Sequence, residues 1–518
     1  MTKEIASEAL AAAPIELVFS PASLGDAAED RVRRILNIPR EQLVHGASYT
    51  GRPYTWIYRD SEYLIKVRAE YRFPTRDARR WIERAREQEQ RLGVHHPAKG
   101  WFLIHADEVA LIANITPKMT PLHTLGEEYS QTDRCALLER MLDLYLGVAA
   151  NHKQRLDEGL SNFAIGADGE LYYVDDDIYR WDELTSLTQA MGFWCRALPW
   201  FTAEVAERIG QVLHQLLERH FRDRHTLMVA ANLIRQLPLV NPEQERRRAG
   251  LLQGLESAAP RKPSSRPKTL GQEPFALLGD IHANYPALQA VLAALDRLGI
   301  RQALVLGDTV GYGPYPLECI RAVRERDFTV IKGNHDYAVV TGQFIKGFSK
   351  NAQAVAEWTR NRLDAEDLAW LDELPPSLHQ DGWLAVHGAP QDKHCFFGYV
   401  YRMSYEANLA NLAERDIPIC FHGHSHITGV YFRDQGGESG FCKENQQSLQ
   451  HYSYCLVSPG SIGQPRDNEG PAAPFAIFDP QTRQLAFHRV DYPVETTIDA
   501  MLANDFPAAL AQRLRNGE

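Results

Sequence analysis

Short apolar runs in the second half of the chain each end in a polar cluster of Asp, His, Asn and Gly residues. The clusters are, in chain order, Gly279–Asn284, Gly307-Asp308, Gly333–Asp336, His387-Gly388 and Gly423–His426. Carboxylate, imidazole and carboxamide side chains together form a ligand set for two transition-metal ions side by side. Two such ions clamp the attacking and leaving oxygens when a phosphoryl group is transferred. The residue types therefore predict a phosphoesterase.

The ligand candidates divide into two sets that share one carboxylate. Asp308 is the natural bridge, because two ions roughly 3.5–4 Å apart need an anion between them. The other candidates are, for one ion, Asp280, His282 and His426 and, for the second ion, Asn334, His387 and His424. Mixed imidazole and carboxylate ligands suit Mn, Fe, Zn or Ni better than Ca. We therefore expect two divalent metals of that kind.

His335 follows a ligand candidate in a turn, so its ring can face the phosphate rather than a metal. We expect it to act as the general acid, or as a charge stabiliser, for the leaving oxygen, with Asp336 orienting it. A single histidine is more often structural than catalytic. The prediction of a catalytic site therefore depends on several polar clusters that occur together, each directly after a predicted strand. For Tyr312 and Arg466 two interpretations stay open: each side chain could contact the substrate or could anchor a loop.

The segments before the clusters have the pattern of short buried strands. They are Phe275–Leu278, Ala303–Leu306, Phe328–Ile331, Leu384–Val386 and Pro418–Phe421. Between the first two, apolar residues from Leu288 to Leu295 recur at helical spacing behind Pro286, which predicts an amphipathic helix. Ligands gather at the carboxyl ends of strands in layered α/β domains. We therefore expect the clusters to converge on one edge of the sheet.

Residues 274–495 resemble the calcineurin-like metallophosphoesterases, and more closely their bacterial branch of phosphodiesterases and phosphoprotein-phosphatase-like proteins. The segments that carry the closer likeness are Leu306–Pro316, Trp370-Leu371, Leu374–Pro376 and Ser458–Arg466. The resemblance implies a four-layer α/β/β/α sandwich and the metal positions given above. Monoesters and diesters are not distinguished, because both are cleaved by the same pair of metals.

The first half carries a second pattern. The segments Thr55–Arg59 and Tyr63–Val67 read as strands joined by a turn, and a helix is predicted from Asp77 to about Leu92. Much later come the polar segments Asp157–Asn162 and Leu171–Asp177. This layout resembles the protein-kinase-like fold, which implies a bilobal α+β domain.

The resemblance to kinases assigns roles residue by residue. Asp157 would accept a proton from the attacking hydroxyl, while Asn162 and Asp175 would hold Mg²⁺ on the phosphates of ATP. Lys66 would grip those phosphates and pair with Glu87 of the following helix. The chain would then carry ATP and Mg²⁺ in its first half.

The first half also departs from the kinase pattern. Its glycine-rich loop keeps only Gly46 and Gly51, Leu156 replaces the usual Arg before the catalytic Asp, and Asp176-Asp177 replace Phe-Gly. Two interpretations stay open: an atypical or small-molecule kinase, and a non-catalytic module that binds nucleotide or a partner and regulates the phosphoesterase.

Composition sets the remaining expectations. The net charge of −11 argues against a general nucleic-acid or membrane binder. Seven scattered cysteines without a CxxC motif fit a reducing compartment, and no signal peptide is evident, so a cytoplasmic protein is expected. The phosphorylated substrate would be a protein, an RNA end or a small metabolite.

The expected organisation is a multi-domain α/β chain. Its predicted parts are an N-terminal extension (1–40), a kinase-like domain (41–244), a basic Pro/Ser-rich linker (245–273), a metallophosphoesterase domain (274–495) and a tail (496–518). If both domains are active, the protein would add and remove phosphate on one class of substrate.

Overall fold

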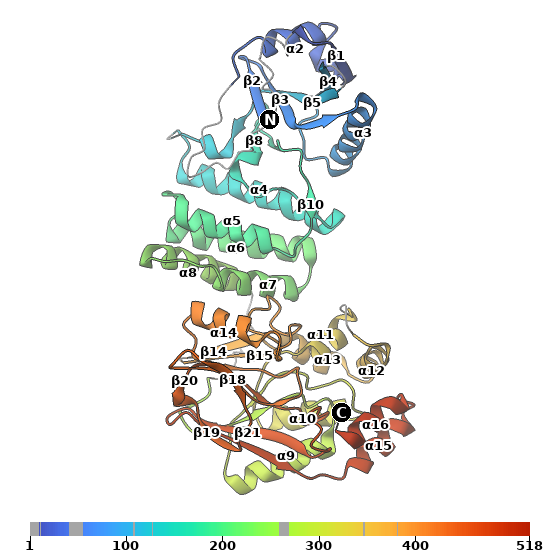
Figure 1. Ribbon diagram of the computed structural model, residues 1–518, viewed down its shortest axis with the longest axis vertical. Coiled ribbons are helices and arrows are strands. Elements are labelled where there is room, and N and C mark those ends of the chain that lie inside the picture. The colour runs from blue at the N-terminus through green and yellow to red at the C-terminus, as the bar shows by residue number, and fades with distance from the viewer. Residues whose placement is uncertain are drawn as a thin grey trace. The chain divides into compact units, whose positions relative to one another are not determined.

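A computed structural model of the protein describes Leu10 and residues 12–40, 55–106, 109–126, 128–257, 269–344, 348–380 and 382–517. The chain separates into two compact units, Met1–Pro260 and Arg261–Glu518, called unit 1 and unit 2 (Figure 1). The predicted glycine loop at Gly46 and Gly51 lies outside the described residues. Among those described, no helix is both long and apolar enough to cross a membrane.

Unit 1 begins with an antiparallel sheet whose strands stand in the order β1-β4-β5-β3-β2. The elements are β1 (Ile15–Phe19), α2 (Ala28–Leu36), β2 (Thr55–Arg59), β3 (Tyr63–Phe73), α3 (Thr75–Leu92), β4 (Gly100–Ala106) and β5 (Val109–Pro117). Because side chains alternate along a strand, Phe102 and Ile104 pack with α2, whereas Trp101 and Leu103 pack with α3. The two helices therefore cover opposite faces of the sheet.

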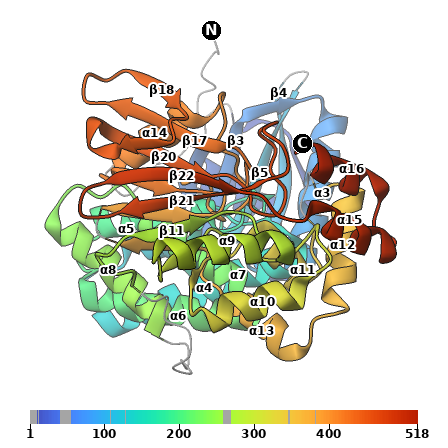
Figure 2. The same cartoon turned by 90° about the horizontal axis from the view of Figure 1, so that it is seen from below.

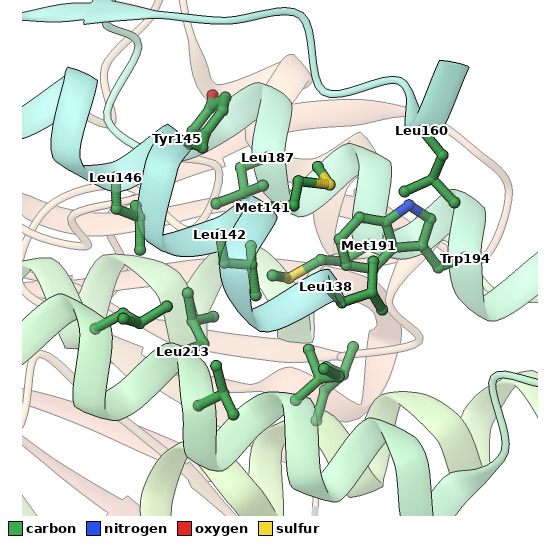
Figure 3. Packing of buried hydrophobic residues seen from close by; sticks show 14 of the residues in the cluster. Leu138, Met141, Leu142, Tyr145, Leu146, Leu160, Leu187, Met191, Trp194 and Leu213 are labelled. Atoms are coloured by element: carbon green, nitrogen blue, oxygen red, sulfur yellow. The ribbon is translucent and has the colours of Figure 1, made fainter. Parts of the chain in front are cut away.

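A helical layer follows in unit 1. The helices are α4 (Gln131–His152), α5 (Thr185–Ala197), α6 (Ala203–Phe221), α7 (Arg224–Arg235) and α8 (Pro242–Ser257), with short strands β6 (Thr120–Pro121), β7 (Gln154–Arg155), β8 (Phe163–Ile165), β9 (Leu171–Tyr173) and β10 (Tyr179–Arg180). Their core is continuous: Met141, Leu142 and Tyr145 of α4 lie close to Met191 and Trp194 of α5 (Figure 3).

Two segments that composition placed outside the predicted domain belong to unit 1. β1, within the expected N-terminal extension, pairs with β4 so that Ile15 lies opposite Ile104. Residues 245–257, expected in the linker, form most of α8, which buries Leu251 and Leu255 in the core. The charged run in α8 suggested solvent on every side, but the apolar residues behind it lie on one helix face.

Unit 2 is built on two sheets, which its described residues form in the orders β13-β12-β11-β21-β22-β19 and β14-β15-β16-β20-β17-β18. The first contains β11 (Phe275–Leu278), β12 (Ala303–Val305), β13 (Thr329–Val330), β19 (Gln446–Ser448), β21 (Ala473–Asp479) and β22 (Gln484–Val490). The second contains β14 (Ser377–Gln380), β15 (Trp383–Val386), β16 (Ile419–Phe421), β17 (Thr428–Asp434), β18 (Ser439–Cys442) and β20 (Tyr452–Pro459). Phe275, Phe421 and Phe478 fill the space between them.

Helices cover the outer faces of both sheets. They are α9 (Tyr285–Leu298), α10 (Pro316–Glu325), α11 (Asn334–Thr341), α12 (Lys350–Arg360), α13 (Ala365–Glu373) and α14 (Tyr405–Glu414). Figure 2 shows α9 below β21 and β22, and α14 packs on β20 of the other sheet. Strands β11, β12 and β13 run parallel, as do β15, β16 and β20. The carboxyl ends of the parallel strands within each sheet therefore meet along one edge.

The C-terminal residues form two helices, α15 (Val494–Ala503) and α16 (Ala508–Asn516). Met501, Phe506 and Leu510 pack against Val355 and Trp358 of α12. The tail predicted over 496–518 is thus docked on unit 2, because its apolar residues recur at helical spacing.

Candidate metal centre

The ligand candidates of unit 2 stand directly after its parallel strands. Asp280 follows β11, Asp308 follows β12, Asn334 begins α11 after β13, His387 follows β15 and His424 follows β16. Each is buried, and the most exposed of them, His424, shows 7% of its surface. Strand order rather than sequence proximity brings them together, as the cluster pattern predicts.

Their side chains form overlapping groups, each with its ligand atoms within 4.8 Å of one another: Asp280, His282 and His426 in one, and Asp308, His387 and His424 in another. A third group, which joins these two, consists of His282, Asp308 and His335. Asp308 Oδ2 lies 3.3 Å from His387 Nε2 and 3.7 Å from His282 Nε2, so this carboxylate faces both groups. Asn334 Oδ1 lies 2.9 Å from His387 Nε2.

The backbone sets the tautomers of the histidines. His282, His387 and His426 each place Nδ1 against a carbonyl oxygen, that of Val310 at 3.3 Å, Leu306 at 2.7 Å and Gln464 at 2.6 Å, respectively. A carbonyl only accepts, so these Nδ1 atoms donate, and a ring of this kind keeps a lone pair on Nε2 as long as it is neutral. Hydrogen bonds of this kind orient the imidazoles that bind metals.

Facing lone pairs show that a cation fits this site. His282 Nε2 and His426 Nε2 are 3.1 Å apart, and His387 Nε2 is 3.2 Å from His424 Nδ1. The Nδ1 atoms of both His282 and His426 donate to carbonyls, so in the neutral rings two acceptor nitrogens face each other and repel unless a positive charge lies beside them. The contact between His387 and His424 is a hydrogen bond if either nitrogen carries a proton. Asp308 Oδ2 is also buried without a hydrogen-bond partner. Imidazole, carboxylate and carboxamide donors together suit divalent transition metals.

The backbone at the site adopts the left-handed conformation at residues other than glycine. The φ angles are +43° at Asp280, +48° at His282, +51° at Asp308, +61° at His424 and +59° at His426. Such conformations cost on the order of 1–3 kcal/mol each and cluster at functional sites. The surrounding structure therefore holds these ligand candidates in strained positions.

His335 lies at the rim of the two groups. Its backbone N–H donates to Asp308 Oδ1 at 2.8 Å, and its ring packs against those of Tyr312 and His282, with centroids 4.5 Å and 4.9 Å away. Burial, opposed by Asp308, lowers the pKa of His335 to about 4. Nδ1 is buried without a hydrogen-bond partner.

Asp336 does not orient His335. Its carboxylate accepts from the backbone N–H of Gly333 at 2.9 Å and of Val310 at 3.2 Å, which closes the first turn of α11. Burial, and next the charge of Asp308, raises the pKa of Asp336 to about 7. The side chain thus joins two loops of the site, an arrangement that adjacency in sequence does not reveal.

Tyr399 is a residue of the site that the motifs missed. Its ring stacks on that of His424, with centroids 3.9 Å apart, yet 48% of its surface is exposed. It belongs to the aromatic stretch Phe396–Tyr401 after His387-Gly388. That aromatic composition is the sequence signal for it.

In unit 1, part of the predicted site comes together. Lys66 Nζ lies 2.5 Å from Asp175 Oδ1. A Cβ at Gly159 would lie 3.1 Å from Asn162 Nδ2 and 3.3 Å from Asp157 Oδ1, so these two side chains approach the same glycine. The lysine, the carboxamide and both carboxylates are half-buried.

The prediction that Lys66 pairs with Glu87 is wrong. Glu87 is exposed on α3, and Lys66 pairs with Asp175 and Asp176. Glu89, two positions further along the helix, accepts from the buried Lys99 at 2.5 Å. Because residues two apart face opposite sides of a helix, only the tertiary structure shows which carboxylate points inward.

Asp176 is the centre of a buried ion cluster. Its carboxylate lies 2.6 Å from Lys99 Nζ, 3.3 Å from Arg68 Nη1, 3.4 Å from Lys66 Nζ and 3.2 Å from Asn114 Nδ2. The side chain is fully buried. Where the kinase pattern has Phe, this chain therefore has a carboxylate that joins β3, β4 and β5 to the segment after β9.

Comparison with known proteins agrees with the geometry of unit 2. The profile of the calcineurin-like phosphoesterase superfamily domain matches residues 274–483. An uncharacterized protein of Methanocaldococcus jannaschii is 31% identical over 244 residues, which cover 46% of this chain and 96% of that protein. The chain belongs to the calcineurin-like phosphoesterase superfamily. The metallophosphoesterase domain lies within unit 2, and its family uses divalent metals to cleave phosphoric esters.

Solved structures of related proteins match the same half of the chain. A metallophosphoesterase from Sphaerobacter thermophilus is 32% identical, covers 48% of this chain and 99% of its own length, and has a TM-score of 0.42. A hypothetical protein from Pyrococcus horikoshii is 24% identical, covers 47% of this chain and 98% of its own length, and has a TM-score of 0.39.

Proposed function

We propose that unit 2 hydrolyses phosphoric esters with two divalent metal ions. Asp280, His282 and His426 would hold one ion, Asn334, His387 and His424 would hold the other, and Asp308 would bridge them. The observation that carries the proposal is that the Nε2 atoms of His282 and His426 face each other at 3.1 Å while both Nδ1 atoms donate to carbonyls, close to Asp308 Oδ2, which accepts no hydrogen bond. Such a centre gains stability from cations and loses it without them.

Two bound ions would polarise the phosphoryl oxygens and lower the pKa of the attacking water. The protein supplies the rest of the chemistry. Asp308 Oδ1 is held by the His335 backbone N–H, so Oδ2 stays aimed at the centre. His335 would contact the leaving oxygen through Nε2, either as a proton donor or as a charge stabiliser.

Hydrolysis of para-nitrophenyl phosphate and its bis-ester, with Mn²⁺ added to metal-free protein, tests the proposal. We expect turnover that needs the metal and that falls by more than about 100-fold in Asp308→Asn, because even residues that only orient a ligand contribute 10–100-fold. The exposed Asp416 provides the matched control, Asp416→Asn. Undiminished turnover in Asp308→Asn would refute the assignment of the site. A panel of phosphopeptides, phosphorylated RNA ends and nucleotides would identify the substrate class.

We also propose that unit 1 binds ATP with Mg²⁺ at Lys66, Asp157, Asn162 and Asp175. The 2.5 Å contact between Lys66 and Asp175 supports this, since it brings together a strand lysine and a carboxylate that a nucleotide's phosphates and Mg²⁺ would separate and bind. ATP labelled at its γ-phosphate would be incubated with wild type, Asp157→Ala and the exposed-turn control Asp168→Ala.

Three results of the ATP experiment are distinct. Transfer of label that is lost in Asp157→Ala would indicate a kinase, and with unit 2 a protein that adds and removes phosphate. Binding without transfer would indicate a module that regulates the phosphoesterase. No binding by the wild type would refute the ATP site.

A further inference from the structure

Arg466 lies beside the candidate metal centre without a carboxylate partner. Its Nη2 donates to Gln464 Oε1 at 2.9 Å, and its backbone N–H donates to the carbonyl oxygen of His426 at 3.3 Å. The Nε atom is buried without a hydrogen-bond partner, and no carboxylate among the described residues pairs with the guanidinium. Arg466 as a whole is half-buried, and a guanidinium partly removed from water without a counter-ion favours the binding of an anion.

Gln464 fixes Arg466 relative to the metal ligands. It is 2% exposed, its carbonyl oxygen accepts from His426 Nδ1 at 2.6 Å, and its side chain accepts from Arg466. Gln464 therefore contacts both the imidazole of His426 and the guanidinium of Arg466, and one buried residue positions both groups.

A tyrosine lies beside the guanidinium. The ring of Tyr312 lies 5.8 Å from the guanidinium carbon of Arg466 and packs edge-on against His282, with centroids 4.7 Å apart. The guanidinium is therefore next to a ring that covers a candidate metal ligand, while the ring of Tyr399 stacks on His424 of the other ligand group.

We propose that Arg466 binds a terminal oxygen of the phosphoryl group and thereby favours phosphomonoesters over diesters. The proposal rests on the phosphoesterase function proposed above for unit 2. A monoester phosphoryl group has three terminal oxygens and up to two negative charges, whereas a diester has two such oxygens and one charge. Two metal ions can engage two oxygens, and Arg466 adds a cationic group for the third.

The chemistry of the side chain suits this role. A guanidinium presents a rigid fork of N–H donors that matches the geometry of phosphate oxygens, and such charge-assisted bonds are about twice as strong as neutral ones. The unpaired Nε of Arg466 is one donor of that fork, and the Gln464 contact uses only Nη2. Lysine would keep the charge but lose the fork.

The test compares both para-nitrophenyl esters in metal-loaded Arg466→Ala and Arg466→Lys. We expect kcat/KM for the monoester to fall roughly 10- to 100-fold in Arg466→Ala, the effect of losing a hydrogen bond to a charged group. The diester should change less than about 3-fold, and Arg466→Lys should be intermediate on the monoester. The control is Arg433→Ala, since Arg433 is a half-buried arginine on β17 that donates to Ser439.

Inhibition by inorganic phosphate and the metal content per chain complete the design. The inhibition constant should rise in parallel with the monoester loss while the metal content stays unchanged. Equal losses on both esters, or unchanged monoester turnover and phosphate inhibition, would overturn the assignment. Should the wild type cleave neither ester with Mn²⁺, the proposed function of unit 2 fails instead, and phosphate titration of the metal-loaded protein still tests Arg466.

Discussion

The absence of a side chain at Gly333 is as important to the metal centre as the ligands themselves. A Cβ at this position would overlap Asp308 Oδ1 and the Asp308 backbone nitrogen. Neither atom can move easily: the nitrogen belongs to the backbone, and Asp308 Oδ1 is held because it accepts a hydrogen bond from the His335 N–H. A methyl group could be accommodated only by moving the candidate bridging carboxylate.

We expect Gly333→Ala to abolish metal-dependent hydrolysis and to lower the metal content per chain. Its φ of −101° is one that alanine adopts, so the effect would come from the clash alone. The measurements are turnover of para-nitrophenyl phosphate and elemental analysis. Gly436→Ala, in the exposed turn between β17 and β18, is the control. Normal turnover in Gly333→Ala would contradict the central position of Asp308.

His335→Ala should lower kcat without loss of metal, because the backbone N–H that holds Asp308 remains. If the ring donates a proton, the loss should reach about 10²–10⁴-fold for an alkyl phosphate and be smaller for para-nitrophenyl phosphate, whose leaving group needs little protonation. Equal losses on both esters would identify a charge stabiliser. A kcat of His335→Ala equal to that of the wild type on both esters would show that His335 takes no part in the mechanism.

At the scale of elements, helices α6 and α8 pack at backbone distance. A Cβ at Gly210 of α6 would overlap the carbonyl oxygen of Leu251, and one at Gly254 of α8 would overlap that of Glu207. The crossing therefore depends on glycine in both helices. By contrast, a Cβ at Gly147 in α4 would make only an ordinary contact with His220.

These contacts predict opposite effects for two Gly→Ala substitutions. Gly254→Ala should destabilise unit 1 by about 1–3 kcal/mol, because it forces a close-packed crossing apart. Gly147→Ala should stabilise it by about 0.5–1 kcal/mol, because alanine is the better helix former. Denaturant unfolding of the full chain measures both. Equal effects would mean that α8 does not pack closely on α6 in solution.

The ion cluster around Asp176 joins the sheet of unit 1 to the segment after β9. Burial would raise the pKa of Asp176, but Lys66, Lys99 and Arg68 together lower it below the ordinary 3.8. A carboxyl group with a depressed folded-state pKa contributes stability above its unfolded pKa and loses that contribution as the pH falls. The pKa of Lys66 is raised, so its contribution is lost only in strong alkali.

Asp176→Asn should destabilise unit 1 by about 3–5 kcal/mol at neutral pH, because it leaves buried cations without their partner. The difference from wild type should shrink as the pH falls below about 4, because the Asp176 carboxylate of the unfolded wild type is then progressively protonated while the folded one stays ionised. Calorimetry of the full chain between pH 3 and 8 measures this. A difference that does not change with pH would refute the electrostatic role of Asp176.

At the scale of the whole molecule, the described core residues divide between the units. The clusters around α4 and on both faces of the first sheet contain residues of unit 1, and those of the two later sheets contain residues of unit 2. Each unit therefore has the apolar interior that independent folding requires. Metal bound in unit 2 should stabilise that unit directly.

Chelation of the metals should lower the melting temperature of unit 2 and leave that of unit 1 unchanged. A ligand that binds only the folded state stabilises it by about 2.7 kcal/mol at 100 times its Kd. Two calorimetric transitions would be assigned with Gly254→Ala, which should move only the transition of unit 1. Movement of both transitions by a chelator would show that the units unfold together.

The sequence by itself predicted the candidate ligand set of unit 2, because metal ligands need particular side chains and each candidate follows a recognisable buried strand. It also placed Lys66 and Asp175 on elements that meet. Composition, however, could not show that residues 245–257 are half-buried in α8, since a charged helix face resembles a linker until its partner is known.

Only the tertiary structure decided which neighbours complete the sites. Glu89 rather than Glu87 points inward because α3 packs in one rotational setting, and Asp336 bonds to backbone from two loops instead of to His335. Arg466 and Tyr399 reach the metal centre from distant segments. No local pattern encodes such contacts, because they arise from how strands and loops far apart in the chain are brought together.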